Sequence, residues 1–356
     1  EAIKRWDIDA VCTGGMSNHY RQVKEVFDAA RAARREIATI GGGALITADP
    51  VLFTRGLGID VGVSGEGERT IVEVADALAG GRGLRDVGGI AYRTGGGEYE
   101  ATEPGPFIED LDSVPYPDYE GFEIDTYLDL QRPDDRQYLY IRDDPRFMFA
   151  VSSRACPYAC SFCFPMFGKK IRKRSLDNFF SEVDMLVERY GVNILGVFDA
   201  LFDTRPEFLH EFCRRTGEYD LNWFMQVRVD SLDEERLEVL RDSGMFALLY
   251  GLESASDTVL KGMRKSADIR KIENSLELAR KMNVRFMGEF IFGHPCETWD
   301  TAMETLSWWK KNNHYQVDMG HVYPFPGSED YRCCIENGII PDGLEYVEQG
   351  CRPVNM

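Results

Sequence analysis

The 356-residue chain lacks the features that mark membrane, secreted and nucleic-acid-binding proteins. No hydrophobic run approaches the roughly 20 apolar residues of a membrane span, and no signal peptide opens the chain. Lysine and arginine together number 41 against 60 acidic residues, so the formal net charge is −19. This balance argues against a nucleic-acid backbone as the main partner. The length allows two domains and a large core.

Three of the nine cysteines are closely spaced, in the run Arg-Ala-Cys156-Pro-Tyr-Ala-Cys160-Ser-Phe-Cys163. Three thiolates can hold three irons of a [4Fe–4S] cluster and leave the fourth iron open for chemistry. A structural zinc site needs a fourth ligand at close spacing, and the nearest later candidates are His210 and Cys213. A disulfide with a spare thiol would suit a secreted protein. We therefore expect a cluster ahead of these two alternatives.

From residue 146 onward, short apolar strands alternate with amphipathic helices, which predicts a parallel α/β barrel. The helices have candidate N-caps, among them Ser175 and Ser231. Because chemistry in such barrels sits at the C-terminal ends of the strands, polar residues there are candidates for the site. The six strands are expected at 147–152, 194–198, 223–229, 246–252, 285–292 and 317–323.

The cysteine spacing resembles the Cys-x3-Cys-x-aromatic-Cys signature of the radical S-adenosylmethionine (SAM) superfamily. The resemblance implies a (β/α)6 partial barrel with the cluster loop just after its first strand. It also implies that the open iron chelates SAM and that one electron from the cluster yields a 5′-deoxyadenosyl radical. The stretches 251–256 (Gly-Leu-Glu-Ser-Ala-Ser) and 323–328 (Tyr-Pro-Phe-Pro-Gly-Ser) are similar to those of a subgroup with methylthiotransferases and cobalamin-dependent members.

The same resemblance implies roles for individual residues at the strand ends. Phe162 would pack on the adenine, Glu253 and Ser254 would bind the ribose or amino group, and Arg228 would meet the SAM carboxylate. A guanidinium suits a carboxylate because it donates two parallel hydrogen bonds. Asp199, which ends the second strand, is a further candidate for cofactor binding. The alternative for each is a solvated or salt-bridged residue of the barrel rim, and no residue is assigned as catalytic.

The first hundred residues form a different unit. Strands expected at 8–12, 37–40 and 60–63 alternate with helices, which predicts an open doubly wound sheet. Glycine pairs and triplets follow the first two strands, at Gly14-Gly15 and Gly41-Gly42-Gly43, where they would let the backbone approach a ligand. No Gly-x-Gly-x-x-Gly fingerprint of dinucleotide binding opens a helix. Residues 88–100 are expected to form a hairpin.

With the barrel following it, this unit resembles an incomplete cobalamin-binding domain, and the resemblance implies cobalamin as a third cofactor. The opening strand and helix of such a domain are absent, so we expect the chain to begin inside it. The Asp-x-His-x-x-Gly cobalt-ligand motif is also absent. His19 is an alternative cobalt ligand, although a solvated histidine at a helix start is commoner.

The expected organisation has four parts: a cobalamin-binding-like domain at 1–102, an ordered strap at 103–145, a radical SAM barrel at 146–335, and the start of a C-terminal region at 336–356. The basic run 169–174 is either a connection that pairs with nearby acids or a site for an anionic partner such as an acidic reductant. Flavodoxin or ferredoxin is the expected electron donor. Cys333, Cys334 and Cys351 could ligate a metal together but are more simply free thiols.

These observations predict a radical SAM enzyme of a reducing cytoplasm. With a [4Fe–4S] cluster, SAM and cobalamin it would methylate or otherwise modify an unactivated carbon of a small organic substrate. One rival is a cyclase or rearrangement enzyme, with or without cobalamin. A rival of another class is a cobalamin-fold sensor or electron-transfer protein without turnover. The sequence does not identify the substrate.

Overall fold

The computed structural model describes residues 2–134 and 140–354, and the chain divides into two compact units. The first unit contains the chain up to Glu109, then Ala159–Gly168 and the residues from His321 on. The second contains Asp110–Tyr158 and Lys169–Gly320. Within the described residues, no helix is both long and apolar enough to cross a membrane.

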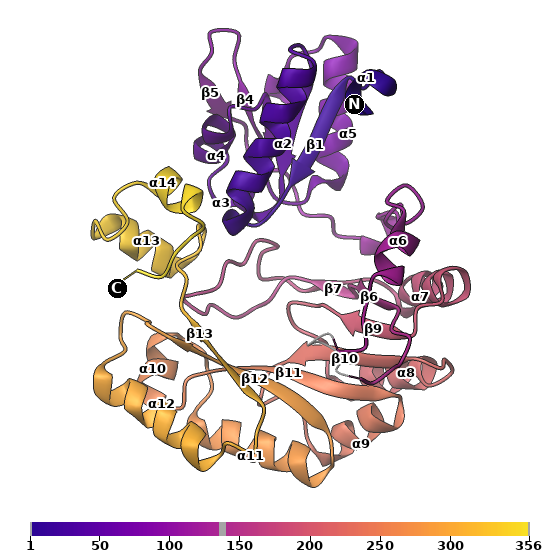
Figure 1. Cartoon of the computed structure of the whole chain (residues 1–356), viewed down its shortest axis with the longest axis vertical. Coiled ribbons are helices and arrows are strands. Elements are labelled where there is room, and N and C mark those ends of the chain that lie inside the picture. Colours follow the sequence, from indigo (N-terminus) through magenta and orange to yellow (C-terminus); the bar gives the residue numbers. More distant parts are fainter. Residues whose placement is uncertain (1, 135–139, 355–356) are drawn as a thin grey trace. The chain divides into compact units, whose positions relative to one another are not determined.

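The first unit is built on a five-stranded sheet in the order β1-β2-β3-β4-β5. The first three strands are parallel, and an antiparallel hairpin completes the sheet, as expected for residues 88–100. Its strands are β1 (Ala10–Gly14), β2 (Ala38–Gly42), β3 (Val61–Val63), β4 (Ile90–Arg93) and β5 (Tyr99–Ala101). Its helices before residue 100 are α1 (Ala2–Arg5), α2 (Tyr20–Ala33), α3 (Gly43–Ala48), α4 (Pro50–Leu57) and α5 (Gly67–Gly80), visible in Figure 1.

Residues far along the chain complete the core of this first unit. Two short helices, α13 (Glu329–Glu336) and α14 (Gly343–Glu348), belong to it. The buried side chains of this cluster come from both stretches of sequence: Tyr20, Val23, Phe27, Leu45, Ile46, Phe53, Leu57 and Ile59 from the early part, and Cys334, Ile340, Tyr346, Val347 and Cys351 from the late part.

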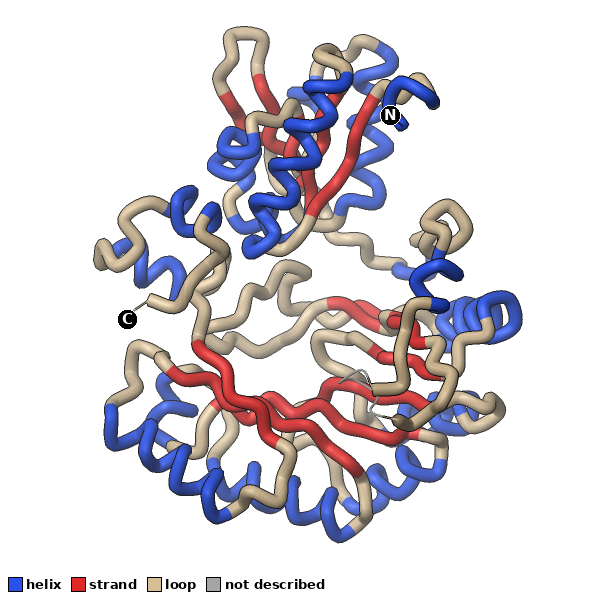
Figure 2. Tube along the Cα trace, viewed as in Figure 1, coloured by secondary structure: helices blue, strands red, loops and turns tan. Residues whose placement is uncertain are grey.

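The second unit is a six-stranded sheet in the order β13-β12-β11-β10-β9-β6, with helices along one side (Figure 2). Neighbouring strands from β6 to β12 are parallel. The strands are β6 (Phe147–Ala150), β9 (Ile194–Val197), β10 (Asn222–Val227), β11 (Met245–Glu253), β12 (Arg285–Phe292) and β13 (Val317–His321). The helices are α7 (Leu176–Tyr190), α8 (Pro206–Thr216), α9 (Glu234–Asp242), α10 (Asp257–Gly262), α11 (Ile269–Lys281) and α12 (Trp299–Lys311).

The two faces of this sheet carry different side chains because strand residues alternate in direction. The main core lies between the sheet and the helices and includes Leu195, Met225 and Leu248. A smaller cluster lies on the other face, which we call the helix-free face; it consists of Phe147, Ile194, Phe224 and Ala247.

The six barrel strands lie within two residues of their predicted bounds. The Ser175 cap of α7 is confirmed, because its side chain accepts the Asn178 N–H. The Ser231 cap was wrong. Asp233 caps α9 instead by accepting the Arg236 N–H, while the Ser231 hydroxyl donates to the Arg228 carbonyl at 2.7 Å.

The expected strap at 103–145 includes 135–139, which lie outside the described residues. Its described part contains a short 3-10 turn at Leu111–Ser113 and the helix α6 (Ile124–Asp129). Leu111 and Tyr119 are buried, whereas Phe122 is 72% exposed. Tyr119 and Leu128 are part of the main core of the second unit, to which the strap belongs from Asp110 on.

Candidate functional site

The loop with the three closely spaced cysteines starts and ends in a two-stranded ribbon. β7 (Ser153–Arg154) pairs antiparallel with β8 (Arg172–Lys173), Ser153 opposite Lys173 and Arg154 opposite Arg172. The loop follows β6, the first strand of the barrel sheet. Both ends of the loop therefore lie just after the C-terminal end of β6, as the sequence predicted for the loop.

None of the three cysteines of this loop forms a disulfide. Cys156 lies in the second unit, and Cys160 and Cys163 lie in the first. The N–H of Cys163 donates to the Cys160 carbonyl at 3.1 Å, and the carbonyl of Ser161 between them accepts two N–H groups from the start of α13. Among the described residues no three His, Cys, Asp or Glu side chains are already arranged around a metal site. Cysteine thiolates are the usual ligands of iron–sulfur clusters, so a loop with three of them suits such a cluster.

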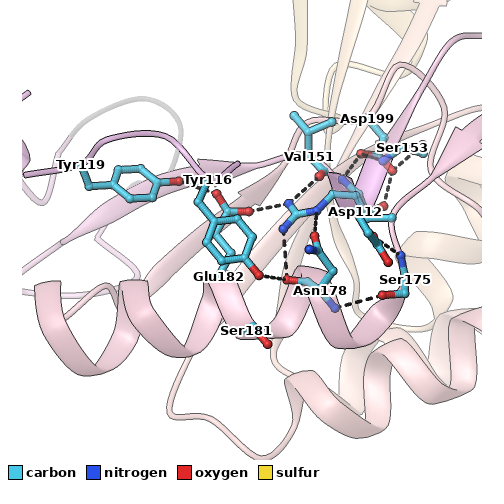
Figure 3. A network of polar contacts seen from close by, with 12 residues as sticks. Asp112, Tyr116, Tyr119, Val151, Ser153, Ser175, Asn178, Ser181, Glu182 and Asp199 are labelled. Atoms are coloured by element: carbon cyan, nitrogen blue, oxygen red, sulfur yellow. Dashed lines mark hydrogen bonds and ion pairs between the residues drawn. The ribbon is translucent and has the colours of Figure 1, made fainter. Parts of the chain in front are cut away.

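Asp199 anchors the start of the loop (Figure 3). Its Oδ1 accepts the backbone N–H groups of Ser152 and Ser153 at 2.7 and 3.0 Å, and its Oδ2 accepts their hydroxyls at 2.5 and 2.8 Å. The side chain is buried, and this burial raises the pKa of the carboxyl although the four hydrogen bonds oppose the shift. Asp199 was predicted to bind a cofactor; here both of its oxygens are occupied by the strand end that leads to Cys156.

Arg174 anchors the end of the loop in a similar way. Its guanidinium forms an ion pair with the buried carboxylate of Glu182 and donates to the Val151 carbonyl at 3.1 Å. It also donates to the side chain of Asn178 at 2.6 Å, and Figure 3 shows these acceptors gathered together. Glu182 accepts a second hydrogen bond from the Tyr119 hydroxyl of the strap at 2.6 Å. The strap thus helps to hold the end of the loop.

Lys173, next to Arg174, forms an ion pair with Asp203. Burial and then the neighbouring Arg205 guanidinium lower the pKa of Lys173 to about 8. Two members of the basic run therefore pair with nearby acids, as the plainer of the two sequence interpretations expected. Lys169 and Lys170 are exposed.

Arg228 lies at the C-terminal end of β10. Its guanidinium carbon is 3.9 Å from the centroid of the Tyr158 ring, two residues after Cys156. It also pairs with Asp230 at 3.0 Å and donates to the Lys265 and Ser266 carbonyls. Together with Lys173 it lines a cavity of about 690 Å³. The cavity contains cationic and aromatic groups within reach of one another beside the cluster loop.

Glu253 and Ser254 end β11 in an irregular turn. The register shifts between Gly251 and Glu253, and Glu253 has a φ of 65°, in the left-handed region. Its carboxylate pairs with Lys265, and a side chain at Gly251 would overlap that carboxylate. Ser254 is buried, and its hydroxyl is 3.0 Å from that of Thr305. Gly251 thus makes room for the Glu253–Lys265 pair.

The helix-free face of the barrel sheet exposes aromatic rings. Phe149 and Phe198 are 40% and 42% exposed, and their centroids are 4.2 Å apart in an edge-to-face contact. Gly196 of β9 lies between the aromatic rings of the neighbouring strands β6 and β10, since a Cβ atom there would be 2.9 Å from Phe149 and 3.0 Å from Phe224. By strand alternation Gln226 and Glu289 point to the same face, and both are exposed. This face therefore presents exposed aromatic rings from β6 and the end of β9 and exposed polar side chains from β10 and β12.

The glycine loops of the first unit pack closely on each other. A side chain at Gly14 would come within 2.6 Å of the Gly42 carbonyl oxygen, and Gly43, with a φ of +83°, would meet Gly15 at 2.9 Å. Gly41 faces Ile59. Gly14 and Gly43 are therefore needed for packing. Gly42 differs, because a side chain there meets only the Val63 oxygen, at 3.9 Å. The space at Gly42 fits the close approach of a bound ring such as cobalamin.

The remaining candidates are spread over the structure. His19 is the N-cap residue of α2 and is exposed. Cys334 and Cys351 are buried in the core of the first unit and Cys333 is exposed, so the three do not form a metal site in the described part of the chain. Phe162 is partly buried in the first unit.

Comparison with known proteins gives two family matches in order along the chain. The B12 binding domain matches residues 1–75, and the Radical SAM superfamily matches residues 151–308. An uncharacterized methyltransferase of Pyrococcus horikoshii is 26% identical over 95% of this chain and 72% of its own length. An anaerobic magnesium-protoporphyrin IX monomethyl ester cyclase of Rubrivivax gelatinosus is 27% identical over 86% of this chain and 55% of its own length.

Two solved structures share the fold. The radical S-adenosylmethionine methyltransferase TsrM from Kitasatospora setae, with cobalamin and a [4Fe–4S] cluster bound, matches 93% of this chain and 65% of its own, with a TM-score of 0.71 and 18% identity. The cobalamin-dependent S-adenosylmethionine radical enzyme OxsB matches 98% of this chain and 49% of its own, with a TM-score of 0.71 and 17% identity. The chain thus spans about half to two thirds of the solved chains that it matches.

Sequence reasoning missed several of these residues. Glu182, Lys265 and Thr305 each pair with a residue of the site, but they lie inside helices or loops with no local motif. The only signal in the sequence was a charged residue at a position that the helical period assigns to the apolar face, as for Glu182 in α7.

Proposed function

Because this chain belongs to the radical SAM superfamily and carries a B12-binding domain, we propose that it methylates an unactivated carbon of a small organic substrate. The observation that carries the proposal is the combination, on one chain, of the two family matches with a loop of three closely spaced cysteines that form no disulfide. When bound, the [4Fe–4S] cluster and cobalamin would supply SAM cleavage and methyl transfer.

In this proposal Cys156, Cys160 and Cys163 hold the cluster. Asp199 and the Arg174–Glu182 pair act as positioning residues, because they fix the two ends of the loop and not its tip. A loop fixed at both ends would keep the three thiols in a defined place for the cluster that they would hold. This matters because small displacements of a reacting group reduce rates strongly.

For SAM itself we propose the side chains at the ends of β10 and β11. Arg228 presents a guanidinium beside Tyr158 of the cluster loop, which suits the SAM carboxylate. Glu253 presents a carboxylate that suits the amino group or the ribose hydroxyls. Its present partner, Lys265, would be displaced or shared. Ser254 is buried against Thr305, so it would act by fixing the turn that carries Glu253.

For the substrate we propose the helix-free face. The exposed rings of Phe149 and Phe198 suit an apolar part of the substrate, and Gln226 and Glu289 suit its hydrogen-bond donors. Contiguous exposed apolar surface is a common feature of ligand-binding grooves.

For the electron we propose a low-potential donor such as flavodoxin or ferredoxin, and a reducing cytoplasm as the compartment. The exposed Lys169 and Lys170 lie in the last part of the cluster loop, after Cys163, and suit an acidic protein surface. An open iron–sulfur cluster also requires protection from oxygen.

The test is anaerobic incubation of the reconstituted full chain with SAM, cobalamin and dithionite. A methyltransferase should form both S-adenosylhomocysteine, from methyl transfer, and 5′-deoxyadenosine, from radical formation. Alanine at Cys156, Cys160 or Cys163 should abolish 5′-deoxyadenosine and the visible absorption of the cluster. Alanine at the exposed Cys333 is the matched control and should change neither.

A cyclase or rearrangement enzyme is the second candidate, favoured by the similarity to the anaerobic cyclase. It predicts 5′-deoxyadenosine without S-adenosylhomocysteine. Formation of neither product by protein with a full cluster would overturn both proposals and favour a sensor or electron-transfer protein.

A further inference from the structure

A thiol and an imidazole lie together in the loop between β12 and α12, outside the site described above. The Cys296 Sγ is 2.9 Å from Nδ1 of His294, and the Cys296 N–H donates to the same nitrogen at 3.3 Å. A nitrogen that accepts a backbone N–H carries no proton in the neutral ring, which places the ring proton on Nε2. Nδ1 is therefore a base directed at the thiol.

The loop is built to hold this pair. Gly293 turns the chain with a φ of +97°, and its N–H donates to the Glu297 carboxylate at 2.6 Å. The Glu297 N–H donates back to the His294 carbonyl at 2.8 Å. A side chain at Gly262 of α10 would overlap the Cys296 sulfur, so a glycine there leaves space for the thiol.

The position also favours a reactive thiolate over an inert buried thiol. His294 is only 6% exposed, whereas Cys296 is partly exposed, so the base is shielded and the sulfur can be reached. The sulfur also lies 3.9 Å from the Val259 carbonyl oxygen of α10, a longer contact than the one with Nδ1. The loop follows a strand end of the barrel sheet, where the reactive groups of such folds lie.

We propose that Cys296 is a nucleophilic thiol with His294 as its base, and that it takes soft carbon electrophiles. In the step, a sulfur electron pair forms a bond to the electrophilic carbon, and the bond from that carbon to its leaving group breaks. The leaving group departs with the electron pair, and the thiol proton passes to Nδ1 of His294. The step needs no oxidant or reductant.

Ionisable side chains close to the pair along the chain are Glu297 in the loop and Asp300 in the first turn of α12, and α10 carries Asp257 and Lys261. Glu297 and Asp257 already accept backbone N–H groups, from Gly293 and Ile269. The His294 imidazole is in hydrogen-bond contact with the sulfur and can accept its proton.

The test is the rate of alkylation by iodoacetamide, followed at each cysteine by peptide mass spectrometry on the anaerobically purified full chain. At pH 6.5, where an ordinary thiol is only about 1% thiolate, Cys296 should react at least about threefold faster than the exposed Cys333. The factor stays modest because a more acidic thiolate is also a weaker nucleophile. Near pH 10 the difference should disappear, because both thiols are then ionised.

The variant His294→Gln removes the base and should lower the Cys296 rate at pH 6.5 to that of Cys333, with no change near pH 10. A merely structural histidine would not produce this dependence on pH. If the variant does not fold, the pH profile of the native chain still decides the question. Cys296 reacting no faster than Cys333 at pH 6.5, or keeping its full rate in His294→Gln, would overturn the proposal without affecting the proposed methyltransferase.

Discussion

Replacing Asp199 should loosen the start of the cluster loop by an amount that depends on the replacement. In Asp199→Ala the two backbone N–H groups of Ser152 and Ser153 lose their acceptor inside the protein, while the two serine hydroxyls can rotate toward other groups. A buried donor without a partner costs about 1–3 kcal/mol. Two such donors cost about 2–6 kcal/mol. The substitution also removes a buried carboxylate, which is itself costly to bury, so the expected loss of local stability is about 2–3 kcal/mol.

Asp199→Asn is the matched control, because its remaining oxygen can accept both N–H groups and its amide can donate to the two hydroxyls. Hydrogen exchange of the peptides around Ser152 measures the local opening. A loss of about 2–3 kcal/mol corresponds to roughly 30–150-fold faster exchange in Asp199→Ala at about 1.4 kcal/mol per decade, with less than about tenfold in Asp199→Asn. Equal exchange in the native chain and Asp199→Ala would refute the anchoring role.

Three further predictions test other parts of the site. In equilibrium dialysis, Gly42→Val should no longer bind cobalamin but should still fold, because a side chain there meets only one protein atom, at 3.9 Å. The control Gly83→Val, on open surface, should still bind the cofactor. Glu253→Ala should lower SAM affinity about tenfold or more at unchanged iron content, since a charge-assisted contact contributes about 1.5–3 kcal/mol; normal SAM binding by isothermal titration would contradict this. With a pKa of about 8, Lys173 should be half neutral at pH 8, against below about 1% for an ordinary lysine. Amine acetylation of Lys173 should therefore rise through pH 8, and a profile that matches Lys169 would argue against the shift.

Local sequence patterns predicted the secondary structure well and the anchoring contacts poorly. The strands that form β9 and β12 are recognisable because their apolar runs are bounded by turn residues. The error at Ser231 arose because Asp233, two residues later, is an equally good cap, and only the path of the chain decides between them.

The anchoring of Ser152 by Asp199 spans 47 positions, and no local pattern predicts a contact at that separation. The sequence only partly explains the glycines of the loops 14–15 and 41–43. Their positions suggested close approach by a ligand, whereas the structure shows that Gly14 and Gly43 are needed because each packs against the backbone of the other loop. The sequence shows His294 and Cys296 two positions apart after a glycine. The turn at Gly293, which brings the two side chains together, could not be predicted from that spacing.

The core shared by α2 and α14 has a consequence for biosynthesis. The apolar surface of Tyr20, Phe27 and Phe53 leaves the ribosome early, but Tyr346 and Val347, which cover it, are translated about 300 residues later. At about 5–20 residues per second the nascent domain waits on the order of 15–60 s with that surface uncovered. Chaperone occupancy should therefore be high during this interval, and expression of residues 1–109 alone should yield aggregates that coexpressed residues 321–356 reduce.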